Sequence, residues 1–198
     1  MRVRPYGPRA VLVEVDGPLQ AAALAGWARE HLAAEEVVPG ATTVLLDGVG
    51  SPAAVREALA GWSPRADAAP GPLVEVPVVF DGPDLAYVAE RWGLSVEAAV
   101  ARLTEVELTS AFCGFAPGFA YLAGLREEWS VPRLASPRPR VDPGSVGLAG
   151  AFCGIYPTAS PGGWRLVGRS EVVLWDLDRL EPALLAPGTR VRLREAGR

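Results

Sequence analysis

The chain has 198 residues and a net charge of -4, so it is long enough to bury a core and lacks the positive charge of a nucleic-acid-binding domain. It contains no lysine, which excludes a Schiff-base lysine and a phosphate-binding loop ending in Gly-Lys. With one histidine and two cysteines, a structural zinc site would lack ligands unless carboxylates or a second chain supplied them. No apolar run matches a membrane span or a signal peptide, so we expect a cytoplasmic protein with no membrane partner.

The first 64 residues predict alternating strands and helices. Residues 6–15 are expected to form a strand and residues 18–32 a helix, and residues 42–46 a second strand. Ser51 is expected to cap a helix that begins with Pro52 and runs to about Trp62. The proline- and glycine-rich residues 65–72 have the composition of a linker, so we expect one domain at 1–64 and another at 73–198.

The second half predicts two short helices and many short strands. Leu73 to Phe80 is expected to be a strand, Asp84 to cap a helix from 85 to 92, and Ser95 to cap another that ends near 103. Short apolar runs separated by Gly and Pro turns then predict a barrel or sandwich. The expected strands are 105–112, 145–148, 154–156, 165–167, 172–175 and 190–193.

Residues 111–169 are too rich in aromatic residues, prolines, glycines and arginines for a regular helix, and we expect the functional site there. Residues 114–122, GFAPGFAYL, form either an aromatic-walled binding loop or a tight turn that plugs the core. The arginines at 133, 138 and 140 lie in a proline-stiffened segment and are either anion ligands or a solvated basic loop. Residues 160–164, SPGGW, predict an amide-rich turn beside a large ring.

The cysteines occur in a repeated tetrapeptide, Ala-Phe-Cys-Gly, at 111–114 and 151–154. The two strands that carry it are expected to lie close together, with Cys113 and Cys153 as small buried residues rather than a disulfide. Groups for proton transfer are scarce, because His31 lies in the first domain and Ser145 has no evident base. The region therefore predicts a site that binds and positions but lacks the groups to transform a substrate.

A series of motifs then indicates a family resemblance. They are DGPDL (81–85), GFAPGFAYL (114–122), PR (132–133), SPRPRV (136–141), PGSV (143–146), GIYP (154–157), SPGGWRLVGR (160–169) and PG followed by VRL (187–193). In this order they resemble the B-subunit family of 5-oxoprolinase, also called allophanate hydrolase subunit 1, which includes the sporulation kinase inhibitor. The resemblance covers the whole second domain.

The resemblance implies an α+β protein with a small ferredoxin-like amino-terminal domain and a cyclophilin-like β-barrel domain. It implies a subunit, inactive alone, that works with the 5-oxoprolinase subunits C and A to convert 5-oxoproline to glutamate with ATP, accompanied by Mg²⁺. Whether ATP contacts this chain stays open. The alternative is a regulatory binding protein that inhibits a sensor histidine kinase through an apolar patch, and a third interpretation is a peptide-binding barrel.

Carried over to this sequence, the resemblance implies a substrate- or nucleotide-binding pocket but assigns no catalytic residue and no metal ligand. Leu103 stands where the family commonly has histidine, and a leucine side chain cannot transfer a proton. The implied pocket residues are Phe115, Pro117, Gly118, Phe119, Tyr121, Arg138, Arg140, Gly144, Ser145, Tyr156, Ser160, Gly162, Gly163 and Trp164.

Overall fold

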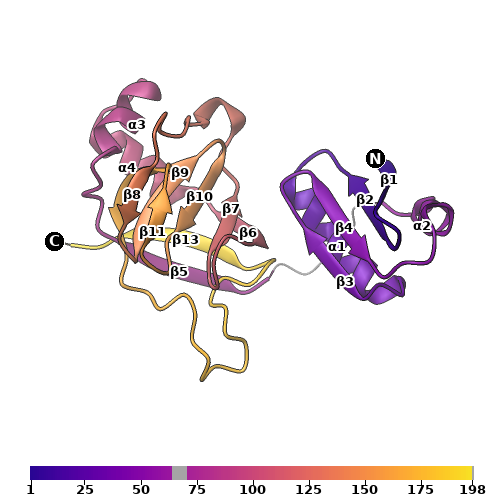
Figure 1. Ribbon diagram of the computed structural model, residues 1–198. Helices are drawn as coiled ribbons and strands as arrows, with labels where there is room; N and C mark the ends of the chain where they lie inside the picture. The colour runs from indigo at the N-terminus through magenta and orange to yellow at the C-terminus, as the bar shows by residue number, and fades with distance from the viewer. Residues whose placement is uncertain (64–70, 198) are drawn as a thin grey trace. The chain divides into compact units, whose positions relative to one another are not determined.

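The computed structural model describes residues 1–63 and 71–197, and the chain divides into two compact units, Met1–Pro70 and Gly71–Arg198 (Figure 1). Both units combine β-sheet with helices. The predicted linker at 65–72 lies largely outside the described residues. No helix in the two described ranges is both long and apolar enough to cross a bilayer.

The first unit is a four-stranded antiparallel sheet with two helices. The strand order is β1-β2-β4-β3, and valines and leucines on one face of the central strands pack against the first helix. Ser51 caps the second helix as predicted, because its Oγ accepts a hydrogen bond from the Ala54 amide at 3.2 Å. The elements are β1 (Arg2–Tyr6), β2 (Ala10–Glu14), α1 (Pro18–His31), β3 (Glu36–Pro39), β4 (Thr43–Asp47) and α2 (Pro52–Leu59).

The expected strand at 6–15 is wrong in its boundaries. Residues 2–14 form a hairpin in which β1 pairs with β2 and Gly7 turns the chain with a φ of 74°. A positive φ is the conformation that glycine adopts without steric cost. No sequence signal indicated β1, because this edge strand is almost entirely exposed and lacks an apolar face.

The second unit is a seven-stranded sheet that curls into a nearly closed barrel. The strand order is β12-β9-β10-β7-β6-β13-β5, and a separate two-stranded ribbon pairs β11 with β8. Reciprocal backbone hydrogen bonds of 2.9 Å between Val79 and Arg169 connect the two edges of the sheet. The strands are β5 (Leu73–Val78), β6 (Leu108–Cys113), β7 (Ala120–Ala123), β8 (Arg138–Val141), β9 (Ser145–Ala149), β10 (Phe152–Ile155), β11 (Ser160–Gly162), β12 (Arg165–Arg169) and β13 (Arg190–Glu195).

Two α-helices, α3 (Leu85–Arg91) and α4 (Val96–Glu105), pack on the barrel, and a short 3-10 helix, η1 (Glu127–Trp129), follows β7. Ser95 caps α4 as predicted, since its Oγ accepts from the Ala98 amide at 3.2 Å. The buried face of α4 includes Leu103, whose side chain is fully enclosed in the barrel core. An apolar residue at 103 therefore has a packing role in this chain.

In the second unit, three strands were not expected and one expected strand is wrong. β7, β8 and β11 lie in segments interpreted as loops, and the last two contain proline, which a two-stranded ribbon at an edge tolerates. Residues 172–175 form no strand, since only Trp175 makes an isolated bridge, to Ala183. Without a full partner strand, the strand-like pattern of this stretch does not lead to a sheet.

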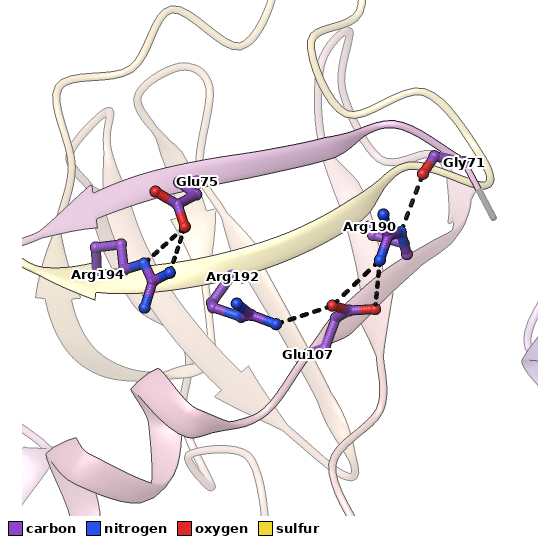
Figure 2. Close-up of polar contacts among 6 residues, drawn as sticks. All are labelled: Gly71, Glu75, Glu107, Arg190, Arg192 and Arg194. Atoms are coloured by element: carbon purple, nitrogen blue, oxygen red, sulfur yellow. Dashed lines mark hydrogen bonds and ion pairs between the residues drawn. The ribbon is translucent and has the colours of Figure 1, made fainter.

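Arginines alternate with buried residues along β13: Arg190, Arg192 and Arg194 lie on its outer face, and Val191 and Leu193 are buried (Figure 2). Glu107 accepts from Arg190 at 3.3 Å and from Arg192 at 3.1 Å. Glu75 on the parallel neighbour β5 accepts from Arg194, and this hydrogen bond lowers the pKa of the Glu75 carboxyl. These ion pairs thus connect β13, the last strand of the unit, to its first strand, β5, and to the segment that enters β6.

The two cysteines are not a buried pair. Both are free, but Cys153 in β10 is buried, whereas Cys113 in β6 is exposed. Only β7 lies between the two strands, and the expectation that both cysteines are buried is wrong for Cys113. The repeated tetrapeptide marks two different environments in one sheet.

Burial raises the pKa of the Cys153 thiol from about 9 to about 12, because the thiolate would be desolvated. The unfolded chain therefore loses this proton first as the pH rises. We expect the free energy of unfolding to fall between pH 9 and pH 12, with a slope approaching about 1.4 kcal/mol per pH unit from this group. Urea titrations at several pH values in this range would give the free energy of unfolding of the wild type and of Cys153→Ala. This free energy should fall more steeply with pH in the wild type. Equal pH dependence of the two proteins would contradict the raised pKa of Cys153.

Candidate functional site

An aromatic pocket of about 270 Å³ opens on the barrel beside the turn between β6 and β7. Its other walls come from the segment before β8, from the end of β10 and from the turn between β11 and β12. Stretches that are far apart in the sequence therefore meet at this site. The lining residues are Phe115, Phe119, Tyr121, Arg133, Pro137, Tyr156, Pro161, Gly162, Gly163 and Trp164.

Phe119 is the centre of the aromatic wall. Its ring makes edge contacts with four others, at centroid distances of 5.2 Å to Phe115, 5.1 Å to Tyr121, 5.5 Å to Tyr156 and 5.4 Å to Trp164. Each such pair contributes about 0.5–1.5 kcal/mol beyond the burial of its area. The contacts hold the rings against one another. The rings of residues 114–122 both pack in the core and line a pocket, and a binding role for this loop stays a prediction.

Phe115 is the exception in this wall, because its side chain is 61% exposed and its backbone is strained. Its φ is 71°, the one positive value among non-glycine residues in the described ranges. A hydrogen bond of 2.8 Å from the Ala116 amide to the Gly114 carbonyl closes a three-residue turn around it. Such strain costs about 1–3 kcal/mol and concentrates at functional sites. Here it holds an apolar ring at the mouth of the pocket.

Tyr156 forms a buried part of the pocket, and its phenol interacts with the Trp164 backbone. Desolvation raises the pKa of this phenol, so it stays protonated at neutral pH. A Cβ atom at Gly162 would lie 2.4 Å from the Tyr156 oxygen, which is closer than atoms can approach. The site therefore requires glycine at 162, and the amide-rich turn predicted at 160–164 is in part the strand β11.

Of the three arginines in the expected cluster, two form ion pairs within the described chain and one is available to contact a ligand. Arg138 donates to the Asp84 carboxylate at 2.8 Å and to the Trp164 carbonyl at 3.2 Å, and Arg140 pairs with Asp142 at 3.0 Å. Arg133 lies 5.9 Å from the Trp164 ring centroid and lines the pocket. No carboxylate of the described residues lies within ion-pair distance of Arg133. It is therefore the guanidinium best placed to meet an anionic ligand.

Asp84 does not cap α3 as expected, since its side chain makes no hydrogen bond to the amides of that helix. It instead accepts from the Leu166 amide at 2.7 Å and from Arg138, and lies 3.6 Å from Arg165. Two largely buried guanidinium groups attract this carboxylate more strongly than neutral amides do. Asp84 thus joins α3 to β8 and β12, and through Arg138 it supports the Trp164 wall of the pocket.

The structure brings half of the implied residues together. Two others, Pro117 and Gly144, line a neighbouring groove, which Tyr156 also lines. Neither cavity is lined by the remaining five, which are Gly118, Arg138, Arg140, Ser145 and Ser160. The residues that line the aromatic pocket are Phe115, Phe119, Tyr121, Tyr156, Gly162, Gly163 and Trp164.

Arg133 was recognised as part of the arginine cluster but was not among the implied pocket residues. The dipeptide Pro-Arg at 132–133, one of the family motifs, was the signal that could have placed it in the pocket. The proline walls, Pro137 and Pro161, were also missed. Leu103, where the family commonly has histidine, lies in the barrel core and not among the lining residues of the pocket.

The pocket is equipped to bind but not to transfer protons near neutral pH. Its lining in the described chain contains one guanidinium and two phenols, and no histidine or carboxylate. A volume near 270 Å³ is at the lower end of small-molecule sites. The arrangement suits a small ligand with a flat apolar face and a negative charge.

This barrel with an aromatic pocket belongs to a known class of domains. The family model "Carboxyltransferase domain, subdomain C and D" matches residues 1–185. The chain therefore belongs to this family, and curated relatives confirm the resemblance to the 5-oxoprolinase B-subunit family.

The curated relatives match about three fifths of this chain. The B subunit of 5-oxoprolinase from Escherichia coli O157:H7 is 48% identical over 123 residues, which are 61% of this chain and 56% of that protein. The corresponding 5-oxoprolinase B subunit of Bacillus subtilis is 41% identical over 61% of this chain and 51% of its own length. The matched segments thus span about half the length of these relatives.

Solved structures share the fold over nearly the whole chain. The crystal structure of TTHA0988 matches with a TM-score of 0.78 and 36% identity, over 96% of this chain and 41% of that chain. The conserved uncharacterized protein PH0987 from Pyrococcus horikoshii matches with a TM-score of 0.58 and 29% identity, over 98% and 97%. The K. lactis urea amidolyase, at 19% identity and a TM-score of 0.74 over 98% of this chain and 15% of that chain, shows the fold alone.

Proposed function

We propose that this chain is a subunit of an ATP-dependent complex that opens 5-oxoproline to glutamate. The observation that carries the proposal is the aromatic pocket with Arg133 at its edge. The flat lactam ring would lie among the rings, and Arg133 would bind the carboxylate. Relatives named as B subunits of 5-oxoprolinase, at 41–48% identity, support this substrate.

Partner subunits would supply the remaining chemistry. The pocket lacks a general acid or base for neutral pH, so activation of the carbonyl by phosphorylation and its hydrolysis would use groups of subunits C and A. We assign the binding of ATP and its Mg²⁺ to the partner subunits, since the aromatic pocket of about 270 Å³ is small for a nucleotide and no group of three or more His, Cys, Asp or Glu side chains of the described residues is placed to hold a metal ion. This chain alone is expected to be inactive, and its cytoplasmic location stays a prediction.

The finer description of the fold is also part of this proposal. The first unit, a four-stranded antiparallel sheet with two helices, supports a ferredoxin-like domain at 1–64. The curled seven-stranded sheet supports a cyclophilin-like barrel at 73–198, with residues 65–72 as the linker. In this arrangement the barrel carries the whole pocket.

Reconstitution tests the proposed function directly. The purified chain would be mixed with subunits A and C, and the formation of glutamate and ADP from 5-oxoproline and ATP would be measured. We expect turnover only when all three are present. The same rate from subunits A and C without this chain would overturn the proposal.

A second candidate is the regulatory protein that binds a sensor histidine kinase. The exposed apolar side chains of Val173, Trp175, Leu177 and Leu180, all in the connection from β12 to β13, would supply the apolar patch that this function requires. This function would be favoured over the enzyme if Arg133→Gln still inhibited autophosphorylation of the kinase and if the wild-type chain gave no gain in activity with subunits A and C.

A further inference from the structure

A groove of about 610 Å³ lies next to the aromatic pocket, and Tyr156 contributes to both. One wall is the start of the long connection from β12 to β13, which projects from the barrel (Figure 1). The opposite wall comes from the turn before β9 and the segment after β10. The lining residues are Pro117, Pro143, Gly144, Tyr156, Pro157, Thr158, Ser170, Glu171, Val172, Val173, Leu174 and Trp175.

Residues 171–175, EVVLW, have the character of a strand without being in a sheet. Their sequence predicts a strand, and their side chains alternate as in a strand that covers a core. Val173 is 57% exposed and Trp175 41% exposed, whereas Leu174 between them is 3% exposed. Residues 171–174 belong to no helix, turn or strand, and only Trp175 takes part in a bridge.

One backbone edge of this segment is paired and the other is open. Leu174 accepts from the Leu184 amide at 2.9 Å, and the Asp176 amide donates to Pro182 at 3.0 Å. Because backbone groups alternate sides along a strand, those of Val173 and Trp175 point the other way. No carbonyl of the described residues accepts from either amide, and the Val173 carbonyl is bound by the Arg179 side chain at 3.0 Å.

The charge of the groove is negative. Glu171 is the one ionised residue among its described lining residues, because the Tyr156 phenol stays protonated. Residues 171–182, which include Glu171, contain four acidic residues and one basic residue, Arg179. A polypeptide that enters this groove would gain from basic side chains beside its apolar ones.

We propose that residues 171–175 bind an extended, apolar and basic segment of a partner protein as an added strand. The partner's backbone would bond to Val173 and Trp175, and its alternate side chains would occupy the groove. The segment would displace Arg179 from the Val173 carbonyl. Since Tyr156 lines both cavities, a segment seated here would also cover one side of the aromatic pocket. The inference does not depend on the reaction proposed above.

A displayed library of random short peptides tests the proposal on the full-length protein. We expect enriched sequences in which apolar residues alternate with arginine or lysine. Synthetic versions of these sequences would be measured by fluorescence anisotropy. Methylating the amide nitrogens on one edge of the peptide should weaken binding about tenfold or more, since strand pairing needs those donors.

Variants locate the binding edge. Val173→Pro removes one open amide, and it breaks no backbone hydrogen bond of the described structure. It should weaken the peptide about tenfold, whereas Leu180→Gln, a charge-neutral change at a fully exposed residue outside the groove, should leave affinity unchanged. Thermal unfolding checks that Val173→Pro is folded, and the methylated peptide provides a test that needs no variant. Failure to enrich any peptide, equal binding of methylated peptides, or equal binding by Val173→Pro and Leu180→Gln would overturn the proposal.

Discussion

Replacing Asp84 with asparagine should lower the free energy of unfolding by about 3–5 kcal/mol, the usual cost of removing one partner from a buried ion pair. The Asp84 side chain is 9% exposed and faces Arg138 and Arg165, which are also largely buried. Asparagine keeps the size and the acceptor for the Leu166 amide, but it leaves two guanidinium groups without their counter-charge. Chemical denaturation monitored by tryptophan fluorescence would measure the loss.

Asp81→Asn is the matched control for this substitution. Asp81 also pairs with an arginine, Arg169, at 3.0 Å, but the Arg169 side chain is 54% exposed. Exposed pairs contribute about 0–1 kcal/mol, so this variant should be nearly as stable as the wild type. If Asp84→Asn cost no more than Asp81→Asn, the three-way contact of Asp84 would not be what holds α3, β8 and β12 together.

Replacing Arg133 with glutamine should raise the KM for 5-oxoproline about 10- to 100-fold in the reconstituted complex. Loss of a charge-assisted hydrogen bond to a carboxylate costs about 1.5–3 kcal/mol, and about 1.4 kcal/mol corresponds to tenfold. The expected change falls mainly on KM, because the carboxylate takes no part in the bond changes at the lactam carbonyl. Steady-state kinetics with varied 5-oxoproline would measure it.

Arg126→Gln provides the comparison for Arg133. Arg126 also lies near a tryptophan ring, 5.6 Å from the Trp129 centroid, and is exposed, but it pairs with Glu128 outside the pocket. Its loss should leave KM unchanged. An unchanged KM for Arg133→Gln would mean that another group holds the carboxylate.

Local signals in the sequence predicted the helices well. The caps at Ser51 and Ser95 form because each hydroxyl reaches an amide only three residues away, which the sequence shows directly. Asp84 carries the same local signal and does not cap, because Arg138, which lies far along the chain, becomes its neighbour after folding. Strand pairing is equally non-local, so β8 and β11 were not predicted.

The same limit applies to the site. The aromatic wall could be predicted because Phe115, Phe119 and Tyr121 belong to one short motif whose rings meet across a tight turn. The arginines could not be ranked, since their sequence context is similar. Only the fold shows that Arg138 is bound to Asp84 and that Arg133 is left facing the pocket.

The parallel pairing of β5 with β13 has a consequence for biosynthesis. β5 opens the second unit, and its partner strand ends at Glu195, so almost the whole unit must leave the ribosome before the two can pair. Until then β5 is an apolar strand whose backbone groups lack their partner strand, and unpaired strands of this kind promote aggregation. Contacts between distant parts of a chain also form slowly. Chaperone demand during synthesis should therefore be greatest in the interval before β13 emerges.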